Sequence, residues 1–218
     1  MTETSLRKRL YPEFARIGAA LASEKRLELI DLLAQAPRNV DALAAETGMP
    51  LASVSQHLQV LRNAKLVEGE RAGNKVVYRL TDPVVLRLWL TLRAVGERRL
   101  PEVERIVREY GDAAPGLTHD ELQALLRSEA VFLIDVRPAI EYTYGHLPGA
   151  ASFPLDELPS RLDELPRDKR IVTYCRGIYC AMSGDAVALL RERGFDVICL
   201  EGGWPEWWDE GRPVDAVG

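Results

Sequence analysis

A cysteine stands where an apolar stretch meets a short loop in the second half of the sequence. The run Ile171-Val172-Thr173-Tyr174 favours a β-strand, and Cys175 follows it directly. A helical pattern then extends from Ala181 to Arg193. Because a strand, a tight turn and a helix N-terminus direct backbone N–H groups and the helix dipole toward one place, we expect Cys175 to have a lowered pKa. An exposed thiolate there would be a nucleophile in an anion-binding loop.

The loop carries a second thiol five residues after the first. The candidate catalytic residues are Cys175, Arg176, Gly177, Ile178, Tyr179 and Cys180. One alternative is that Cys175 is structural, since an unpaired cysteine packs like a small apolar residue. Cys180 either packs beneath the loop or attacks a persulfide on Cys175, which would give a disulfide or a polysulfide. Cys199 lies in an apolar stretch and is expected in the core.

Length and composition describe an ordinary globular chain. Its 218 residues suffice for one large domain or two small ones, and 47% hydrophobic with 28% charged residues gives no sign of disorder. No apolar run is long enough for a membrane span, and Met1–Leu10 lacks the apolar segment of a signal peptide. The three cysteines do not form a disulfide framework, so we expect a cytoplasmic protein without membrane contact.

Charge is distributed unevenly between the two halves. Residues 1–112 contain 18 Lys and Arg against 15 Asp and Glu, whereas residues 113–218 contain 10 against 18. The net charge of −5 therefore hides a mildly basic first half. Such a half is compatible with nucleic-acid contact.

The first half predicts several helices and a hairpin. We expect helices over Leu10–Leu21, from Ser23 to before Pro37, over Val40–Glu46 and over Ala52–Ala64, then a β-hairpin of Leu66–Arg71 and Lys75–Leu80. In the fourth helix, Val54, Leu58 and Leu61 form an apolar stripe. Two short helices joined by a turn with Gly48 and followed by a charged hairpin indicate a winged helix-turn-helix.

The polar face of the fourth helix and the hairpin suits DNA. Short polar side chains can meet base edges, and basic ones can neutralise phosphates. The candidate DNA-binding residues are Ser53, Ser55, Gln56, His57, Gln59, Arg62, Lys65, Arg71 and Lys75. A small helical bundle with a solvated polar face is the alternative.

Residues 10–108 resemble the ArsR/SmtB family of bacterial repressors. The resemblance rests on Ser53 to Leu61, then Leu66-Val67 and the Gly73…Tyr78 wing. It implies a homodimer that binds operator DNA, with the terminal helices at the dimer interface; Pro83–Leu100 is a long amphipathic candidate. The metal sites of such repressors use cysteines near the third helix or Asp and His on the last helix. Neither set is present, so we expect no metal site and assign residues 1–112 to DNA binding and dimerisation.

Strands and helices alternate in the second half, which predicts a parallel α/β sheet. Thr118 begins a helix, and Gly111 to Gly116 form the linker before it. We expect strands over Val131–Ile134, around Ser152-Phe153, over Ile171–Tyr174 and over Val197–Leu200, and helices over Leu155–Leu162 and Ala181–Arg193. The fold is therefore a two-domain one, a mainly α winged helix-turn-helix followed by an α/β domain.

Residues 117–218 resemble a rhodanese domain. The motifs are Asp135-Val136-Arg137, Glu141-Tyr142…Gly145-His146-Leu147-Pro148-Gly149-Ala150, the Cys175 loop and Leu200-Glu201-Gly202-Gly203-Trp204. The resemblance implies that Cys175 takes a sulfane sulfur from thiosulfate or a persulfide and passes it to a thiol, without a cofactor. Asp135, Arg137, Glu141 and His146 are expected to support the loop. Phosphatases of this general fold need an arginine six positions after the cysteine, where Ala181 stands.

Three functions fit these observations. The favoured one is a repressor whose rhodanese domain senses sulfane sulfur or thiol oxidants through Cys175, with Cys180 as the second thiol. A sulfurtransferase enzyme tethered to DNA is the second. The third is an arsenite or metal sensor that uses the two thiols.

Overall fold

The computed structural model describes residues 3–109 and 116–215. The chain divides into two compact units, Met1–Leu92 and Arg93–Gly218, and the division lies inside helix α5 (Pro83–Arg99). The boundaries at 112 and 117 drawn from the sequence follow the linker instead and stay a prediction. Most of that linker and the expected helix stop at Gly111 lie outside the described residues.

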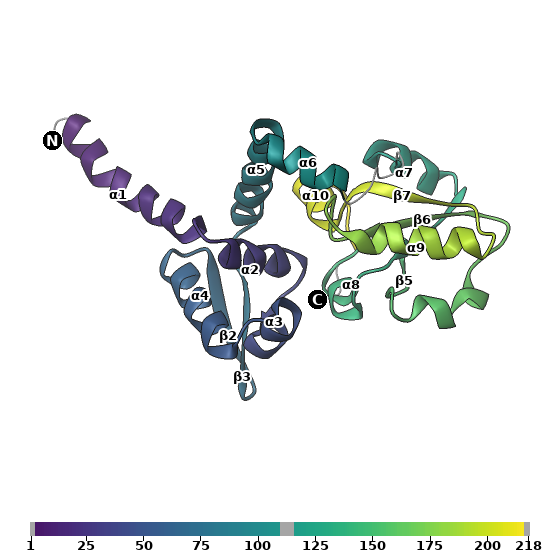
Figure 1. Ribbon diagram of the computed structural model, residues 1–218, viewed down its shortest axis with the longest axis horizontal. Coiled ribbons are helices and arrows are strands. Elements are labelled where there is room, and N and C mark those ends of the chain that lie inside the picture. Colours follow the sequence, from purple (N-terminus) through teal and green to yellow (C-terminus); the bar gives the residue numbers. More distant parts are fainter. Residues whose placement is uncertain (1–2, 110–115, 216–218) are drawn as a thin grey trace. The chain divides into compact units, whose positions relative to one another are not determined.

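The first unit consists of helices and a small antiparallel sheet (Figure 1). Its elements are α1 (Glu3–Leu21), α2 (Glu24–Gln35), β1 (Arg38–Asn39), α3 (Val40–Thr47), α4 (Leu51–Asn63), β2 (Val67–Ala72), β3 (Lys75–Leu80) and the first part of α5. The strand order is β1-β3-β2. The expected winged helix-turn-helix is confirmed, although α1 begins well before Leu10.

Leucines and valines at helical spacing build the core of the first unit. Val54, Leu58 and Leu61 of α4 are fully buried, as their spacing predicts, and they pack with Leu29 and Ile30 of α2. Helix α3 ends at Gly48, whose positive φ of 67° suits a glycine C-cap. This packing leaves the polar face of α4 outside.

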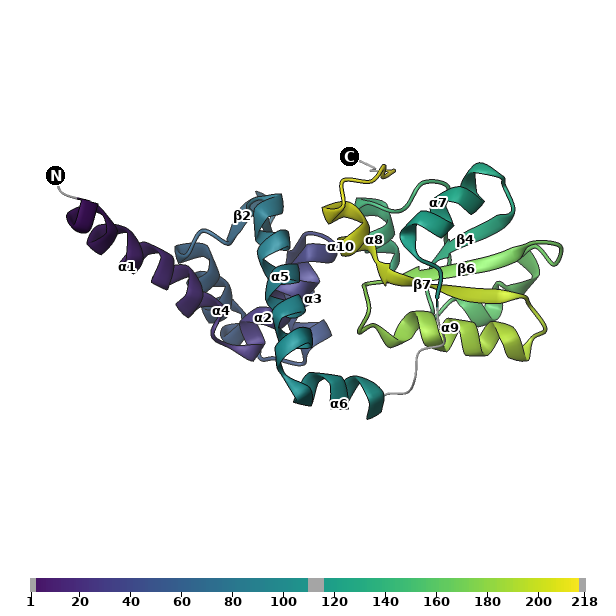
Figure 2. The same ribbon diagram turned by 90° about the horizontal axis from the view of Figure 1, so that it is seen from above.

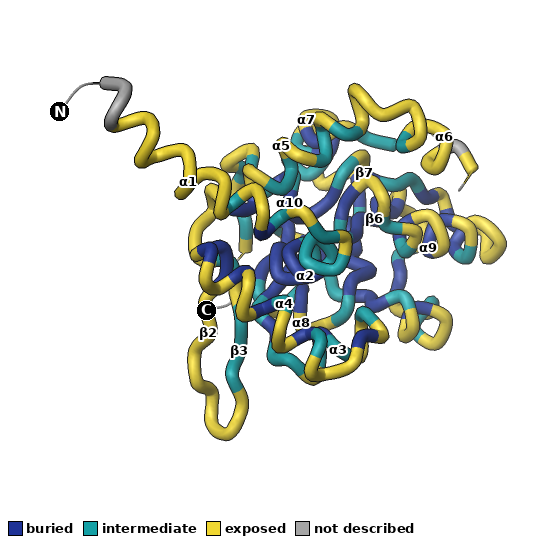
Figure 3. The backbone as a smooth tube through the Cα atoms, turned by 60° about the vertical axis from the view of Figure 1, so that its left-hand side comes forward, coloured by how far each residue is buried: buried dark blue, intermediate teal, exposed yellow. Residues whose placement is uncertain are grey.

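The wing is an exposed hairpin closed by a tight turn. Ala72 pairs with Lys75 across Gly73-Asn74, and Gly73 has a φ of 63°. The hairpin is mostly exposed along its length (Figure 3). Strand β1, which the sequence did not predict, pairs Arg38 with Tyr78. The side chain of Arg38 is buried and donates to Leu32 O at 2.7 Å, so it satisfies a carbonyl near the end of α2.

The second unit is a parallel sheet with helices on both faces (Figure 2). After the end of α5, its elements are α6 (Pro101–Glu109), α7 (His119–Arg127), β4 (Val131–Asp135), α8 (Ala139–Tyr144), β5 (Ala151–Ser152), β6 (Arg170–Cys175), α9 (Ala181–Glu192), β7 (Val197–Gly203) and α10 (Trp204–Asp209). The strand order is β5-β4-β6-β7, and every pairing in it is parallel. The expected α/β sheet is confirmed.

Alternation along β6 assigns its side chains to two cores. Ile171 and Cys175 pack in the cluster that contains Ala186 and Leu190 of α9. Val172 and Tyr174 pack in the other cluster, with residues of α7 and α10. Successive strand residues point to opposite faces, so the reactive position at the strand's end faces α9.

One expected helix is wrong. Residues 155–162 contain no α-helix; two short 3₁₀ turns, Leu158–Ser160 and Leu162–Glu164, take its place. Pro159 lacks the backbone N–H that an α-helix would need there. Helix α10, which the sequence did not predict, follows Gly203 with Pro205 in its first turn.

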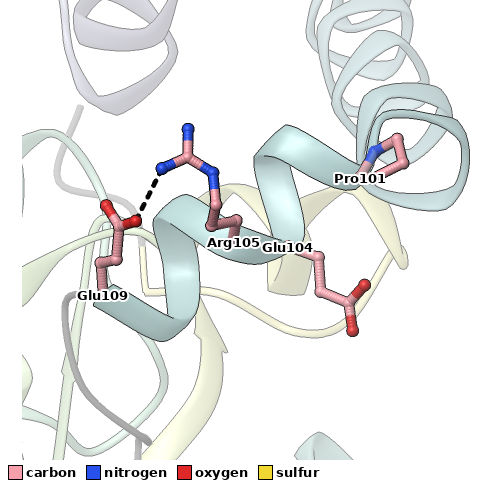
Figure 4. Close-up of a pocket in the computed structure, with 4 residues that line it drawn as sticks. All are labelled: Pro101, Glu104, Arg105 and Glu109. Carbon is pink, nitrogen blue, oxygen red and sulfur yellow. Dashed lines mark hydrogen bonds and ion pairs between the residues drawn. The ribbon is translucent and has the colours of Figure 1, made fainter.

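Two further observations concern the helices. Within the described residues, no helix is long and apolar enough to cross a membrane. Pro101, Glu104, Arg105 and Glu109 line a shallow hollow on α6, where Arg105 and Glu109 form a 2.7 Å ion pair and Glu104 points away from them (Figure 4). None of these residues belongs to the thiol loop.

Candidate functional site: a two-thiol loop and a helix for DNA

The thiol loop, residues 175–180, connects the carboxyl end of β6 to the start of α9. The backbone N–H of Cys180 donates to Gly177 O at 3.0 Å, which closes a tight turn. Thr173 of β6 and Ser183 of α9 are buried, and their hydroxyls lie 2.7 Å apart. The two ends of the loop are therefore held together by the strand and the helix that flank it.

Cys175 differs from the exposed thiolate that the sequence predicted. It is 1% exposed and lies in the apolar cluster under α9. Its pKa is raised well above the ordinary thiol value, first because its S–H donates to Cys180 and then because it is buried. Hydrogen bonds from the backbone of Gly177 and Ser183 lower its pKa, but they do not outweigh these two causes. The expectation of a lowered pKa at this position was wrong.

Cys180 is the acidic member of the pair. Its pKa is lowered to about 7, chiefly by the hydrogen bond from the Cys175 thiol. Backbone hydrogen bonds with Arg176 and Met182 and the charge of Arg176 lower it further, while burial opposes them. Cys180 is also the N-cap of α9 and is less buried than Cys175. Cys175 Sγ also donates to the backbone O of Cys180 at 3.5 Å, and the opposite pKa shifts of the two thiols favour the negative charge on Cys180.

Arg176 is anchored to a neighbouring helix. Its Nε donates to both carboxylate oxygens of Glu141 on α8, at 2.9 and 3.1 Å. Glu141 is fully buried, and the Arg176 side chain is 21% exposed. A fork-shaped pair of this kind is among the stronger polar contacts in proteins. It ties the residue next to Cys175 to α8.

A second buried network supports the strand that carries the loop. Asp135 and Arg137 are fully buried and form a 2.6 Å ion pair. Tyr174 of β6 donates to Asp135 Oδ2 at 2.6 Å, and Arg137 Nη2 donates to Gly145 O at 2.8 Å. This network connects β4 and the segment after α8 with β6, the strand that leads into the loop.

His146 belongs to the segment after α8 rather than to the thiol loop. Its Nδ1 lies 2.9 Å from Tyr142 O, and its ring stacks on the Tyr142 ring at 3.8 Å between centroids. Its backbone exchanges two hydrogen bonds with Asp215, each 3.0 Å long. These contacts give His146 a role in holding that segment in place.

Glycines permit the close packing of the loop against β7 and α10. Gly177 has a φ of 133°, and a Cβ there would lie 2.9 Å from the Glu206 carboxylate. A Cβ on Gly203 would lie too close to Cys175 O and Gly177 N for a side chain to fit. The backbone of β7 therefore forms a wall against the start of the loop.

Sequence reasoning missed three residues around the loop, namely Arg93, Glu97 and Glu206. Arg93 and Glu97, on the last turns of α5, contact Glu206 and Tyr179, respectively. No motif in the sequence connects these positions, which are about 80 to 110 residues apart along the chain. Within the described residues, no group of three or more His, Cys, Asp or Glu side chains is arranged as a metal site.

The first unit presents the polar residues expected to bind DNA on its surface. Ser53 and His57 are half-buried, and the others are exposed: Ser55, Gln56, Gln59, Arg62, Lys65, Arg71 and Lys75. Arg62 donates to Gln59 at 2.7 Å, and Gln59 donates to Asn63 at 2.7 Å. The Lys75 ammonium lies 3.0 Å from Asp41 in an exposed pair, which leaves it accessible to a phosphate.

The comparisons with known proteins match both halves. Residues 23–68 match the bacterial regulatory protein arsR family, and residues 118–210 match the rhodanese-like domain. The chain is 42% identical to the HTH-type transcriptional regulator Rv0324 of Mycobacterium tuberculosis over 207 residues, which cover 94% of this chain and 92% of the relative. It is 37% identical to a sulfurtransferase of Allochromatium vinosum over 95 residues, 43% of this chain and 87% of the relative.

Among solved structures, the chain is similar to the homodimeric winged helix-turn-helix DNA-binding domain of a Mycobacterium bovis protein. The identity is 38%, the match covers 46% of this chain and 91% of that one, and the TM-score is 0.43.

Fold and similarity together define a DNA-binding transcriptional regulator that also carries a rhodanese-like domain. The chain belongs to the ArsR family of transcriptional regulators.

Proposed function

We propose that this regulator is a repressor that loses affinity for its operator when sulfane sulfur or a thiol oxidant modifies the Cys175–Cys180 pair. The observation that carries the proposal is the close approach of the two thiol-bearing residues, in which Cys175 Sγ lies 3.5 Å from Cys180 O and the pKa of the Cys180 thiol is lowered to about 7. The pair lies at the carboxyl end of a parallel strand, where α/β folds bind ligands.

The chemistry needs both thiols. Transfer of the shared proton to Cys180 makes Cys175 the thiolate, which attacks the outer sulfur of a persulfide RSSH and releases RSH. Cys180 then attacks the Cys175 sulfur and expels hydrogen sulfide, which leaves a Cys175–Cys180 disulfide. The protein loses two electrons and the persulfide gains them, so no other oxidant is needed. A brief exposure to a sulfur donor thereby leaves a lasting covalent bond between Cys175 and Cys180.

Charges around the loop favour a sensor over an enzyme that uses thiosulfate. Two guanidinium groups near the loop are engaged by carboxylates, Arg176 by Glu141 and Arg93 by Glu206. A dianionic donor would have to compete with these carboxylates. The reacting end of an organic persulfide carries at most one negative charge and meets less repulsion. Similarity to a sulfurtransferase over the second unit keeps the enzyme as the alternative function.

A homodimer would present two α4 helices to DNA. Exposed apolar side chains follow one face of α5, namely Val84, Leu88, Leu92 and Val95. A second set lies on α1, namely Leu6, Leu10, Tyr11 and Phe14. Rows of apolar residues on adjacent turns are typical of a helix that packs against a partner. We propose that a second copy of the chain covers them.

Fluorescence anisotropy tests the proposal, with a DNA duplex selected from a random pool by the reduced protein. Polysulfide is expected to weaken binding by tenfold or more, on the order of 1.4 kcal/mol, in the wild type. Cys175→Ser and Cys180→Ser should bind DNA but not respond, whereas Cys199→Ser should respond fully. Equal affinity of the wild type before and after confirmed loop modification would refute the sensor. Rapid thiosulfate:cyanide turnover without any change in DNA affinity would favour the tethered enzyme.

A further inference from the structure

Within the second unit, the C-terminal end of α5 contacts the thiol loop at Tyr179 and contacts Glu206 of α10, which packs against the loop. Arg93 Nη2 lies 2.9 Å from Glu206 Oε1, and the Glu206 carboxylate lies against Gly177 near the start of the loop. One helical turn later, Glu97 Oε1 accepts a 2.7 Å hydrogen bond from the hydroxyl of Tyr179 near the end of the loop. The Arg93 guanidinium also lies over the Tyr179 ring, 5.1 Å from its centroid. These contacts join α5 to the end of the loop directly at Tyr179 and to its start through Glu206 of α10.

The Arg93–Glu206 ion pair is stable only while the two side chains keep their relative position. The side chains of Arg93 and Glu206 are 9% and 20% exposed, so both charges are largely removed from water. Arg93 Nε and both Glu206 carboxylate oxygens are buried without an aligned hydrogen bond from the described residues, although the charged groups are within ion-pair distance. Each charge therefore depends on the other, and a shift of either leaves a poorly compensated buried charge.

Tyr179 makes a second contact with α5, a hydrogen bond to Glu97 that depends on the position of the loop. Burial and the hydrogen bond to Glu97 raise the pKa of Tyr179 to about 12, so the phenol remains a donor at neutral pH. Tyr179 directly precedes Cys180. A displacement of Cys180 therefore also moves Tyr179 and disturbs the hydrogen bond between the Tyr179 hydroxyl and the Glu97 carboxylate.

We propose that Arg93 and Glu97 couple α5 to the thiol loop, so that oxidation of the Cys175–Cys180 pair breaks their contacts and releases the C-terminal end of α5 from the loop. A covalent S–S bond of about 2.05 Å is shorter than a contact between non-bonded sulfurs, so its formation draws Cys180 toward Cys175 and pulls Tyr179 away from Glu97. Helix α5 is continuous from Pro83 to Arg99, and its residues 83–92 belong to the DNA-binding unit. The inference rests on the proposed function, to which it adds the route of regulation.

Hydrogen–deuterium exchange on the full chain tests this route. Diamide takes two electrons and two protons from a pair of thiols and so forms the disulfide without a sulfur donor. In a Cys199→Ala background, exchange of residues 93–99 should become about fivefold faster or more upon oxidation, because local opening follows the loss of the contact. Peptide mass mapping confirms the disulfide in each sample.

Variants of α5 sharpen the test. Glu97→Ala and Arg93→Gln should exchange rapidly at residues 93–99 in the reduced protein already, with little further change on oxidation. Glu102→Ala, which removes an exposed acidic side chain on α6, should behave as the wild type. Equal exchange before and after oxidation would overturn the proposal, as would Glu97→Ala behaving like Glu102→Ala or a failure of both thiols to oxidise.

DNA affinity of the same samples separates this proposal from the sensor function. Faster exchange at 93–99 with unchanged DNA affinity would support the α5 contact and refute the sensor. A loss of DNA affinity with unchanged exchange would keep the sensor and overturn the α5 route.

Discussion

Arg176 donates from Nε to both carboxylate oxygens of Glu141, at 2.9 and 3.1 Å, so the residue beside Cys175 is held by a side chain of another helix. The buried partner is the carboxylate, and the guanidinium is partly exposed. The loop therefore owes part of its conformation to a charge that the linear motif around Cys175 does not contain.

Glu141→Gln is expected to destabilise the second unit, because it leaves Arg176 with a neutral acceptor in a largely buried site. The expected loss is about 2 kcal/mol, the usual contribution of hydrogen bonds to charged groups. Urea unfolding measures it. Glu164→Gln, which weakens the solvent-exposed pair with Arg161, should have a much smaller effect on unfolding. Equal effects of the two substitutions would contradict the role assigned to Glu141.

The pH dependence of alkylation should identify the acidic thiol. Cys180 has a lowered pKa of about 7, and its thiolate is the reactive form, so its reaction with iodoacetamide should rise as pH increases through about 7. Cys175 has a raised pKa and should react slowly over the same range. In Cys175→Ala the hydrogen bond is lost, and the inflection for Cys180 should move toward the ordinary thiol value. Peptide mapping would contradict this assignment if it found Cys175 alkylated first.

The polar face of α4 and the wing should differ in what they contribute to DNA binding. Arg71→Ala removes an exposed charge of the hairpin, so it should weaken binding to all sequences and lower the salt slope by about one. Gln56→Ala should cost about 1–3 kcal/mol on the selected sequence and little on others. Anisotropy titrations at several salt concentrations measure both. A salt slope that changes with Gln56→Ala but not with Arg71→Ala would reverse the two roles.

Introducing a charge on the exposed apolar face of α5 should disrupt the dimer. Leu92 is 39% exposed, and Leu92→Glu would place a carboxylate in the proposed interface, where burial of a charge is unfavourable. Light scattering after size exclusion should then report a monomer. Ile140→Glu makes the same change on α8, where the side chain is 54% exposed, and should leave the mass unchanged. A dimer that persists in Leu92→Glu would place the interface elsewhere.

Local patterns predicted much of the fold from the sequence. The spacing of Val54, Leu58 and Leu61 predicted a buried stripe, and Gly73 predicted the turn of the wing; both were confirmed. Pro159 removes a donor in the middle of the expected helix over residues 155–162, so the weak apolar periodicity there was misleading.

The electrostatics of the site were less predictable because they depend on long-range packing. The loop motif alone indicated an acidic Cys175, but the face on which a strand residue lies decides its burial, and Cys175 faces α9. The partner thiol then determines which sulfur holds the proton. Likewise, Arg93 and Glu206 are brought together by the fold, and neither position carries a local signal.

The lack of room at Gly203 determines the direction in which the thiol loop can yield. Because the backbone of β7 abuts Cys175 O and Gly177 N, the start of the loop has no room to move toward that strand. A proposed rearrangement of the loop would therefore be expected at its other end, where residues 178–180 lead into α9. The contact with β7 thus fixes the Cys175 end of the loop, and the proposed disulfide would have to move the Cys180 end toward it.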